Sequence, residues 1–304
     1  MTSKTEISLP SPVPFNFERT AHSHGWAVLV PNTWNDDKRS LSRSYRLETG
    51  RVVLLDIQGD PTQDRIIVQI ESVNSLTGEE EREIETAVTR MLRLDEDLSA
   101  FYHICREKGG SWVKLTKGLG RLLRSPNVFE DLVKTICTTN IQWGGTTRMV
   151  ANFVDVLGEP YPGDPNHRSF PTPESAAEIS LEDFTESIRL GYRGPYVHQV
   201  AQHVVTGLLD LDSWQNPTTP TVELKKALLA VKGVGNYAAA TMLMLLGCYD
   251  EIAVDTVFRD FVAEKYFNGK RPPDTEAKAV YDEWGKWKYL AYWFDIWQKY
   301  DETL

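Results

Sequence analysis

The stretch Leu229-Ala-Val-Lys-Gly-Val-Gly-Asn-Tyr-Ala-Ala-Ala-Thr241 decides the fold of this chain. Residues 223–231 carry apolar side chains at helical spacing, and a second helix-forming run follows Asn236. Gly233 and Gly235 interrupt the two runs, and glycine accepts positive φ and lets another molecule approach the backbone closely. The stretch therefore predicts two helices joined by a tight glycine hairpin, with Asn236 as the N-cap of the second helix.

This hairpin has the chemistry of an anion site. The amide groups around Gly233, Val234 and Gly235 should point outward at a helix N-terminus, where the helix dipole favours negative charge. Lys232 adds a positive charge that a phosphate diester would attract. The same glycines could equally serve only to permit a bend between two helices, so the hairpin alone leaves both interpretations open.

A single carboxylate, Asp255, follows the hairpin in the segment Ile252-Ala-Val-Asp-Thr-Val-Phe-Arg259. Its position before a helix-like run predicts that it caps that helix. A capping carboxylate is held in one orientation, so it could also stabilise a developing cation or orient a water molecule. A hairpin suited to phosphate, followed by one fixed acid, indicates chemistry on a nucleic acid.

Four segments, in this order along the chain, resemble the helix-hairpin-helix (HhH-GPD) DNA glycosylase superfamily. Residues 120–140 are similar to the segment that ends at the strand-inserting residue of 8-oxoguanine glycosylases, and Leu190-Gly-Tyr-Arg-Gly-Pro-Tyr196 is similar to their Leu-Gly-Tyr-Arg segment. The hairpin with Ile-Ala-Val-Asp-Thr resembles the catalytic motif of the superfamily. Residues 284–293 resemble the C-terminal helix of the bacterial 3-methyladenine glycosylase II group.

The resemblance implies an α+β fold, with an N-terminal antiparallel β-rich domain followed by a two-part all-helical HhH glycosylase body. We expect four segments: a β-rich domain over 1–75, helices that pack with the C-terminal helices over 76–125, the HhH catalytic domain over 126–260, and C-terminal helices that complete the body over 261–304. Strand-like runs at 52–57 and 65–70 fit the β-rich start. Residues 1–15 are predicted only to be extended, and Thr77-x-x-Glu80 predicts a capping box at the start of a helix.

The resemblance also implies roles for individual residues. Asp255 matches the catalytic acid, and Asn140 matches the residue that enters the gap left by a flipped base. Tyr192 and Arg193 match residues near the orphaned partner base. The hairpin residues would hold the DNA backbone, and the carbonyl groups of three of its positions would hold a Na⁺ or K⁺ ion; these positions are Leu229, Val231 and Val234.

Several departures from the superfamily pattern bear on the reaction. Bifunctional members carry a lysine at the position of Tyr237, and a phenol cannot form the imine that an amine forms with C1′. Tyr237 could instead stack on the extruded base, or it could simply pack in the core. Val257 replaces a histidine that 8-oxoguanine enzymes often have, and Lys232 replaces the usual hairpin proline. The four-cysteine cluster of the endonuclease III branch is absent, so we expect no iron–sulfur cluster.

Two further tryptophan positions are candidates for the site. Trp143 follows Asn140 closely and is a candidate to face DNA, and Trp26 could line the base pocket from the β-rich domain. The tryptophans from Trp284 to Trp297 are expected to lie in one terminal helix and to pack in the core.

Composition fits a soluble enzyme that contacts DNA locally. The 304-residue chain has a formal net charge of −10, which argues against a DNA-binding surface spread over the whole molecule. No apolar run is long enough for a membrane span, and the N-terminus lacks a signal-peptide core. The widely spaced Cys105, Cys137 and Cys248 indicate reduced thiols. We expect a monomer located in the cytoplasm with the nucleoid, or in the nucleus of a eukaryote.

The sequence therefore predicts a monofunctional DNA glycosylase without AP-lyase activity, which requires no cofactor. Its partner would be double-stranded DNA that contains a damaged base, and its substrate an N-alkylated purine of the 3-methyladenine type. One alternative is an 8-oxoguanine or mismatch glycosylase on the same scaffold. An alternative of another class is a non-catalytic damage-sensing DNA-binding protein.

Overall fold

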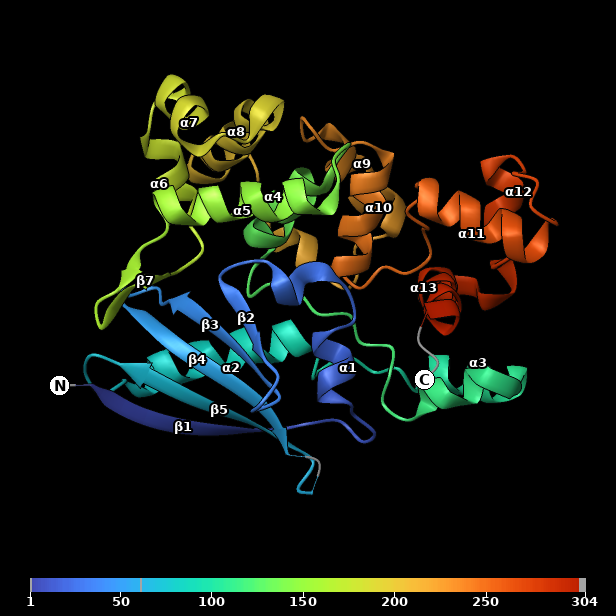
Figure 1. The fold of residues 1–304 in the computed structure, drawn as a ribbon, viewed down its shortest axis with the longest axis horizontal. Coiled ribbons are helices and arrows are strands. Elements are labelled where there is room, and N and C mark those ends of the chain that lie inside the picture. The colour runs from blue at the N-terminus through green and yellow to red at the C-terminus, as the bar shows by residue number, and fades with distance from the viewer. Residues whose placement is uncertain (1, 61, 301–304) are drawn as a thin grey trace. The chain divides into compact units, whose positions relative to one another are not determined.

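The computed structural model describes residues 2–60 and 62–300 (Figure 1). The chain forms two compact units, the first made of residues 1–97 and 117–211 and the second of residues 98–116 and 212–304. The first unit contains an antiparallel sheet and helices, and the second is helical. The predicted α+β class, with a β-rich N-terminal part before a helical body, is confirmed.

Within the described residues, the sheet of the first unit has five antiparallel strands in the order β1-β5-β4-β3-β2. The strands are β1 (Ser3–Pro10), β2 (Asn32–Asn35), β3 (Ser40–Arg46), β4 (Val52–Asp60) and β5 (Arg65–Ser72). Strand β1 was predicted only as an extended segment. It forms a full edge strand because Ile7 and Leu9 alternate with polar residues and pair in register with β5.

One face of the sheet forms part of the core. Leu55 lies opposite Ile70 and Ile57 lies opposite Val68, and all four side chains are buried. Helix α2 (Gly78–Leu92) lies beside the sheet and contacts β1 (Figure 1). It begins at the predicted capping box, in which Thr77 accepts the amide of Glu80 and the Glu80 carboxylate accepts the amide of Thr77.

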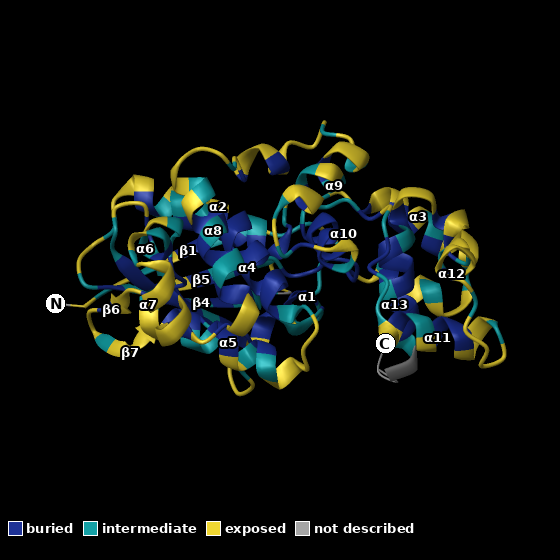
Figure 2. Cartoon of the chain, turned by 90° about the horizontal axis from the view of Figure 1, so that it is seen from above, coloured by how far each residue is buried: buried dark blue, intermediate teal, exposed yellow. Residues whose placement is uncertain are grey.

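The first unit contains further helices, of which α4 is buried along nearly its whole length (Figure 2). Contacts join α4 to α5, α5 to α7, and α8 to both α6 and α7. A short hairpin of two strands contacts β3 and β4. These elements are α1 (Phe17–Ala21), η1 (Gly25–Val28), α4 (Val128–Thr138), α5 (Trp143–Leu157), β6 (Pro160–Tyr161), β7 (Asp164–Arg168), α6 (Pro173–Glu178), α7 (Leu181–Ile188), η3 (Gly191–Arg193) and α8 (Gly194–Val205).

The second unit packs around α10, which is buried from Ala238 to Leu245. Its elements are α3 (Ser99–Lys108), η2 (Gly110–Thr116), η4 (Asp212–Gln215), α9 (Thr221–Ala230), α10 (Asn236–Leu245), α11 (Thr256–Tyr266), α12 (Asp274–Ala279), η5 (Asp282–Trp287) and α13 (Lys288–Tyr300). The prediction of one terminal helix for the last tryptophans is wrong. Gly285 has a φ of 55°, which places Trp284 and Trp287 in η5, before α13 begins.

Along the described part of the chain, no helix has both the length and the apolar character that a membrane span requires.

Candidate active site and nucleic-acid interface

The predicted glycine hairpin joins α9 to α10. Helix α9 ends at Ala230, and its C-cap residue Val231 is extended. Gly233 has a φ of 91°, in the left-handed region that glycine adopts without strain. The amide of Val234 donates to the carbonyl of Val231 at 3.1 Å and closes the turn. The sequence prediction of a tight turn with positive φ is therefore confirmed at Gly233.

The second glycine, Gly235, is the N-cap of α10, with a φ of −92°. The prediction that Asn236 caps this helix is wrong, because Asn236 already lies in the first turn and the Gly235 carbonyl accepts the amide of Ala239 at 2.8 Å. The first amide groups of any helix have no partner within the helix. A Cβ added at Gly235 would meet no described atom within 4 Å, so packing does not require this glycine and the space beside these amides is open.

The other hairpin residues divide by exposure. Lys232 is exposed, Leu229 is largely exposed and Val234 is buried. The carbonyl groups assigned to a cation, those of Leu229, Val231 and Val234, are hard oxygen donors of the kind that bind alkali ions. The Val231 carbonyl already accepts one hydrogen bond, from Val234, and keeps its second lone pair. The donor chemistry of this turn thus fits Na⁺ or K⁺, and the ion stays a prediction.

Asp255 is the N-cap of α11, as the sequence predicted. Its Oδ1 accepts the amide of Phe258 at 2.7 Å, and its carbonyl accepts the amide of Arg259 at 3.2 Å. The side chain of Phe258 is fully buried and meets the ring of Tyr292 edge to face at 5.0 Å. The half-buried carboxylate is thus held in one place by a helix that is itself anchored in an aromatic core.

The negative charge of Asp255 affects the pKa values of two tyrosines, Tyr237 and Tyr289. Burial and the negative charge of Asp255 raise the pKa of Tyr237, partly opposed by the hydroxyl group of Thr241. Burial, together with Tyr237, Tyr292 and Asp255, raises the pKa of Tyr289 well above its usual range. Both phenols are therefore neutral hydroxyl groups at physiological pH. A half-buried carboxylate that is held in one orientation is able to stabilise positive charge.

Sequence reasoning missed Tyr289. This residue lies in the first turn of α13, and its amide donates to the carbonyl of Tyr249 at 2.7 Å. Its ring stacks on Trp293 at 6.1 Å and is buried. The only signal in the sequence was its place in an aromatic stripe, which predicts a core position and does not separate this ring from its neighbours.

In the first unit the structure brings Asn140, Tyr192 and Arg193 together. Asn140 follows the C-cap of α4 with a φ of 48°, and its Nδ2 donates to the Tyr192 hydroxyl at 3.3 Å. The hydrogen bond from Asn140 lowers the pKa of Tyr192. The Arg193 guanidinium lies 4.3 Å from the centre of the Tyr192 ring and donates to the carbonyl and hydroxyl oxygens of Thr139. Asn140 and Tyr192 are thus exposed on a surface that a buried arginine supports.

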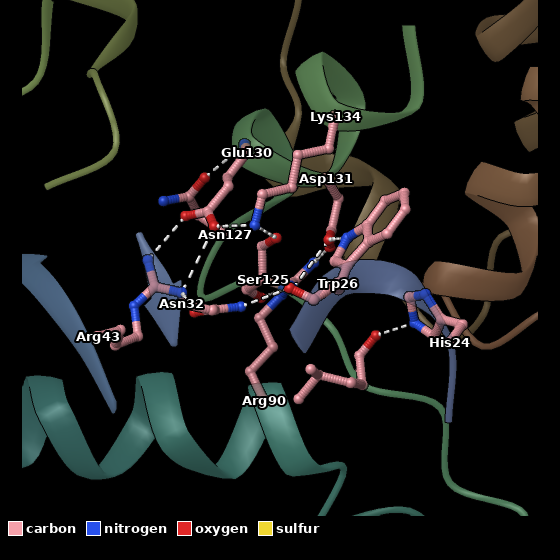
Figure 3. Close-up of polar contacts among 11 residues, drawn as sticks. His24, Trp26, Asn32, Arg43, Arg90, Ser125, Asn127, Glu130, Asp131 and Lys134 are labelled. Atoms are coloured by element: carbon pink, nitrogen blue, oxygen red, sulfur yellow. Dashed lines mark hydrogen bonds and ion pairs between the residues drawn. The ribbon is translucent and has the colours of Figure 1, made fainter. Parts of the chain in front are cut away.

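The two candidate tryptophans differ in exposure. Trp143 begins α5 and is 43% exposed, whereas Trp26 is 4% exposed. The indole Nε1 of Trp26 donates to Oδ1 of Asp131 at 2.9 Å, and its ring lies 4.8 Å from that of His24 (Figure 3). Trp26 therefore packs in the interior of the first unit, and its assignment to a base pocket stays a prediction.

A buried ionic network links α4 to the sheet and to α2 (Figure 3). Glu130 of α4 pairs with Arg43 of β3 and with Lys134, and all three side chains are almost completely buried. Asp131 pairs with Arg90 of α2 at 3.0 Å. This network could not be predicted from the sequence, because it joins charged residues that are far apart in the chain.

The HhH-GPD model, which describes the superfamily of base excision DNA repair proteins, matches residues 133–286. This match spans half of the chain, and the chain therefore belongs to the HhH-GPD superfamily. Membership makes the protein a DNA glycosylase whose partner is DNA. A comparison with curated protein sequences gives no match.

Solved structures share this fold over almost the whole chain at low sequence identity. The 3-methyladenine DNA-glycosylase of Archaeoglobus fulgidus is 19% identical with a TM-score of 0.73, over 97% of this chain and 98% of that one. The Clostridium acetobutylicum 8-oxoguanine glycosylase/lyase, in complex with DNA containing cytosine opposite 8-oxoguanine, is 16% identical with a TM-score of 0.68, over 98% of each chain. MBOgg1 with a low-affinity DNA ligand is 21% identical with a TM-score of 0.68, over 95% of each chain.

Proposed function

We propose that this DNA glycosylase is monofunctional and hydrolyses the N-glycosidic bond of a flipped, N-alkylated purine such as 3-methyladenine. The observation that carries the proposal is Asp255 itself, a half-buried carboxylate that is rigidly capped and whose charge acts on the neutral phenol groups of Tyr237 and Tyr289. No lysine occupies the position of Tyr237, from which the bifunctional members of the superfamily attack.

Asp255 suits the electrostatics of the reaction. Cleavage of the bond develops positive charge on the deoxyribose, and a fixed carboxylate beneath C1′ stabilises that charge without reorganising. The same carboxylate can orient the attacking water molecule. Because an N-alkylated purine is itself cationic, it leaves without a dedicated acid. The electron-rich ring of the half-buried Tyr237 would attract such a base by about 0.5–2 kcal/mol through cation–π contact.

The DNA contacts follow from the exposed groups of each unit. The open amides at the start of α10 would bind phosphate oxygens, with Lys232 adding charge. Asn140 would fill the space that the flipped nucleotide leaves, since base chemistry on a duplex requires base flipping. Tyr192 and Arg193 would lie near the orphaned partner base. The hairpin cation, if bound, would add positive charge beside the phosphate, and the protein would act wherever chromosomal DNA lies.

The decisive experiment identifies the free base that the protein releases from a duplex carrying several lesions. We expect 3-methyladenine or another alkylated purine in the chromatogram, and no covalent adduct after borohydride treatment of the reaction. A trapped adduct would show that an amine attacks C1′ and would overturn the monofunctional assignment. Release of a neutral oxidised base instead would overturn the assignment of the substrate.

A second candidate function, 8-oxoguanine or mismatch excision, is favoured by the cluster of Asn140, Tyr192 and Arg193, because these positions match the 8-oxoguanine enzymes in the sequence. A panel of duplexes, each with one defined lesion or mismatch, separates the two glycosylases by their rates. Turnover on methylated genomic DNA separates both from a non-catalytic damage sensor, which would bind the DNA and release nothing.

A further inference from the structure

Trp143 is placed unlike the other tryptophans of the chain. Among the tryptophans whose side chains the structure describes, it is the one that is largely exposed, with 43% of its surface accessible. Tryptophan has a large apolar surface and is highly buried on average. Exposing an indole at the start of α5 contributes nothing to the core, so its position calls for another explanation.

The indole of Trp143 rests directly on the backbone of Gly25. A Cβ added at Gly25 would lie closer than 3.0 Å to Cη2 and Cζ2 of the ring, so any larger residue would displace the indole. Gly25 is outside the left-handed region, and its backbone conformation alone does not demand glycine. The close contact with Trp143 is therefore the reason that this position suits glycine.

The backbone of Gly25 is a firm support because both of its neighbours are anchored. The ring Nε2 of His24 lies 2.6 Å from the carbonyl of Leu123, and the indole of Trp26 donates to Asp131 (Figure 3). The Trp26 ring is buried and the His24 ring is half-buried. The indole of Trp143 is thus held in place from below while its surface stays open to solvent.

A second apolar side chain on the same loop is held in a similar way. Ile141 is 41% exposed, and its Cδ1 and Cγ1 atoms occupy the space that a Cβ at Gly145 would need. The loop that follows Asn140 therefore presents two exposed apolar groups, each lying on a glycine of the same unit. This arrangement indicates a preformed contact surface.

Trp143 is also near the place where Asn140 would enter the duplex. Three residues of chain span at most about 10 Å, and neighbouring bases of a strand are about 3.4 Å apart. A ring three residues beyond Asn140 can therefore reach the emptied position or a base within about three steps of it.

We propose that Trp143, supported by Gly25, is a second stacking residue of the DNA interface, and that it packs against a nucleobase adjacent to the position that Asn140 fills. This inference rests on the proposed function, in which Asn140 enters the duplex. Indole rings stack on all four bases, so Trp143 strengthens binding to flipped-out DNA irrespective of sequence.

The test compares the DNA affinity of the parent protein with that of Trp143→Ala, Trp143→Phe and Gly25→Ala. Each protein is measured on two duplexes, one with a tetrahydrofuran abasic-site analogue and one undamaged. Loss of one base–aromatic stack lowers affinity by roughly 5- to 100-fold. We expect such a loss on the abasic duplex for Trp143→Ala and Gly25→Ala, and a smaller loss for Trp143→Phe. Gly144→Ala is the matched control, because a Cβ there meets nothing within 4 Å.

2-Aminopurine placed one to three steps from the analogue locates the contact, since stacking on an indole quenches its fluorescence. We expect quenching at one of these steps with the parent protein and its loss in Trp143→Ala. Unchanged affinity for the abasic duplex in Trp143→Ala, or in Gly25→Ala with the fold intact by circular dichroism, would overturn the inference. So would equal losses on both duplexes.

The excision assay keeps this inference separate from the proposed function. If the parent protein releases a damaged base while Trp143→Ala binds the abasic duplex and excises the base normally, only the role of Trp143 fails. If binding to the abasic duplex depends on Trp143 while no base is ever released, only the proposed function fails.

Discussion

Arg43 and Glu130 form a two-point ion pair inside the first unit. Their Nη2–Oε2 distance is 2.9 Å and their Nη1–Oε1 distance is 3.4 Å, and each side chain is 1% exposed. Lys134 adds a contact of 2.6 Å to Oε1. Burial alone would raise the pKa of Glu130, but the positive charges of Arg43 and Lys134 outweigh it and hold this pKa at about 2. The carboxylate therefore balances two buried cations.

Removal of this carboxylate should destabilise the protein severely. Glu130→Ala leaves Arg43 and Lys134 buried without their partner, and breaking a buried ion pair costs about 3–5 kcal/mol. Urea denaturation followed by circular dichroism measures the free energy of unfolding. The matched control is Glu159→Ala, which breaks the solvent-exposed pair of Glu159 with Arg46 and should cost about 0–1 kcal/mol. Equal effects of the two variants would contradict a structural role for the network.

His24 should make stability depend on pH in a defined window. Burial lowers the pKa of His24 from 6.5 to about 4, partly opposed by its hydrogen bond to the Leu123 carbonyl. As pH falls from 6.5 to 4, the unfolded chain takes up a proton at this residue and the folded chain does not, so the free energy of unfolding falls by up to about 3 kcal/mol.

The variant His24→Gln should lack most of that loss, because glutamine does not titrate. Denaturation curves at the two ends of the window give the difference, and His103→Gln, at an exposed histidine, is the control. If the free energy of unfolding depends on pH in the same way for the parent protein and for His24→Gln, then His24 is not held in its neutral form in the folded protein.

Substitution of Asp255 should separate catalysis from helix capping. Asparagine caps a helix about as well as aspartate, so Asp255→Asn should keep stability and abasic-site binding but lose excision by several orders of magnitude. Asp255→Ala should lose excision and also about 1 kcal/mol of stability. Single-turnover excision and thermal denaturation of both variants check the two effects. Retained excision in Asp255→Asn would remove this carboxylate from the mechanism.

The two hairpin glycines should respond differently to alanine. Gly233→Ala places a side chain at a φ of 91° and should cost stability, with DNA affinity falling as the turn distorts. At Gly235 an added methyl group meets no described atom within 4 Å, so Gly235→Ala should cost only the weaker N-cap preference of alanine, while the methyl group obstructs the approach of a phosphate to the α10 amides. Affinity for the abasic duplex, measured beside melting temperature, tests this pattern. An undiminished affinity in Gly235→Ala would place the DNA backbone elsewhere.

The sequence predicted features that depend on neighbouring residues. The positive φ of Gly233, the cap at Asp255 and the Thr77–Glu80 box are set by local backbone and side-chain chemistry, and all three are present. The prediction of Asn236 as N-cap was wrong. It rested on the preference of asparagine side chains for this position, whereas the backbone already becomes helical at Asn236 and the extended N-cap residue is Gly235.

Features that depend on distant residues could not be predicted. Arg43 and Glu130 are 87 positions apart, and charged residues are expected at the surface unless their partners are known. Tyr289 is positioned by the hydrogen bond from its amide to the carbonyl of Tyr249 and by the start of α13. Neither feature can be predicted from a run of aromatic residues in the sequence. The bend at Gly285, with its φ of 55°, was not predicted either, because the surrounding residues form a continuous aromatic-rich run.

Helix α4 ends two residues before Asn140, and its side chains Glu130 and Asp131 are bonded to β3, η1 and α2. If Asn140 enters the duplex as we propose, the stacked bases push back on it with equal force. The ion pair of Glu130 with Arg43 would transmit that force from α4 to strand β3 and so keep Asn140 in place. The N-terminal sheet would then contribute to excision by resisting this force, although Asp255 and the glycine hairpin belong to the other unit.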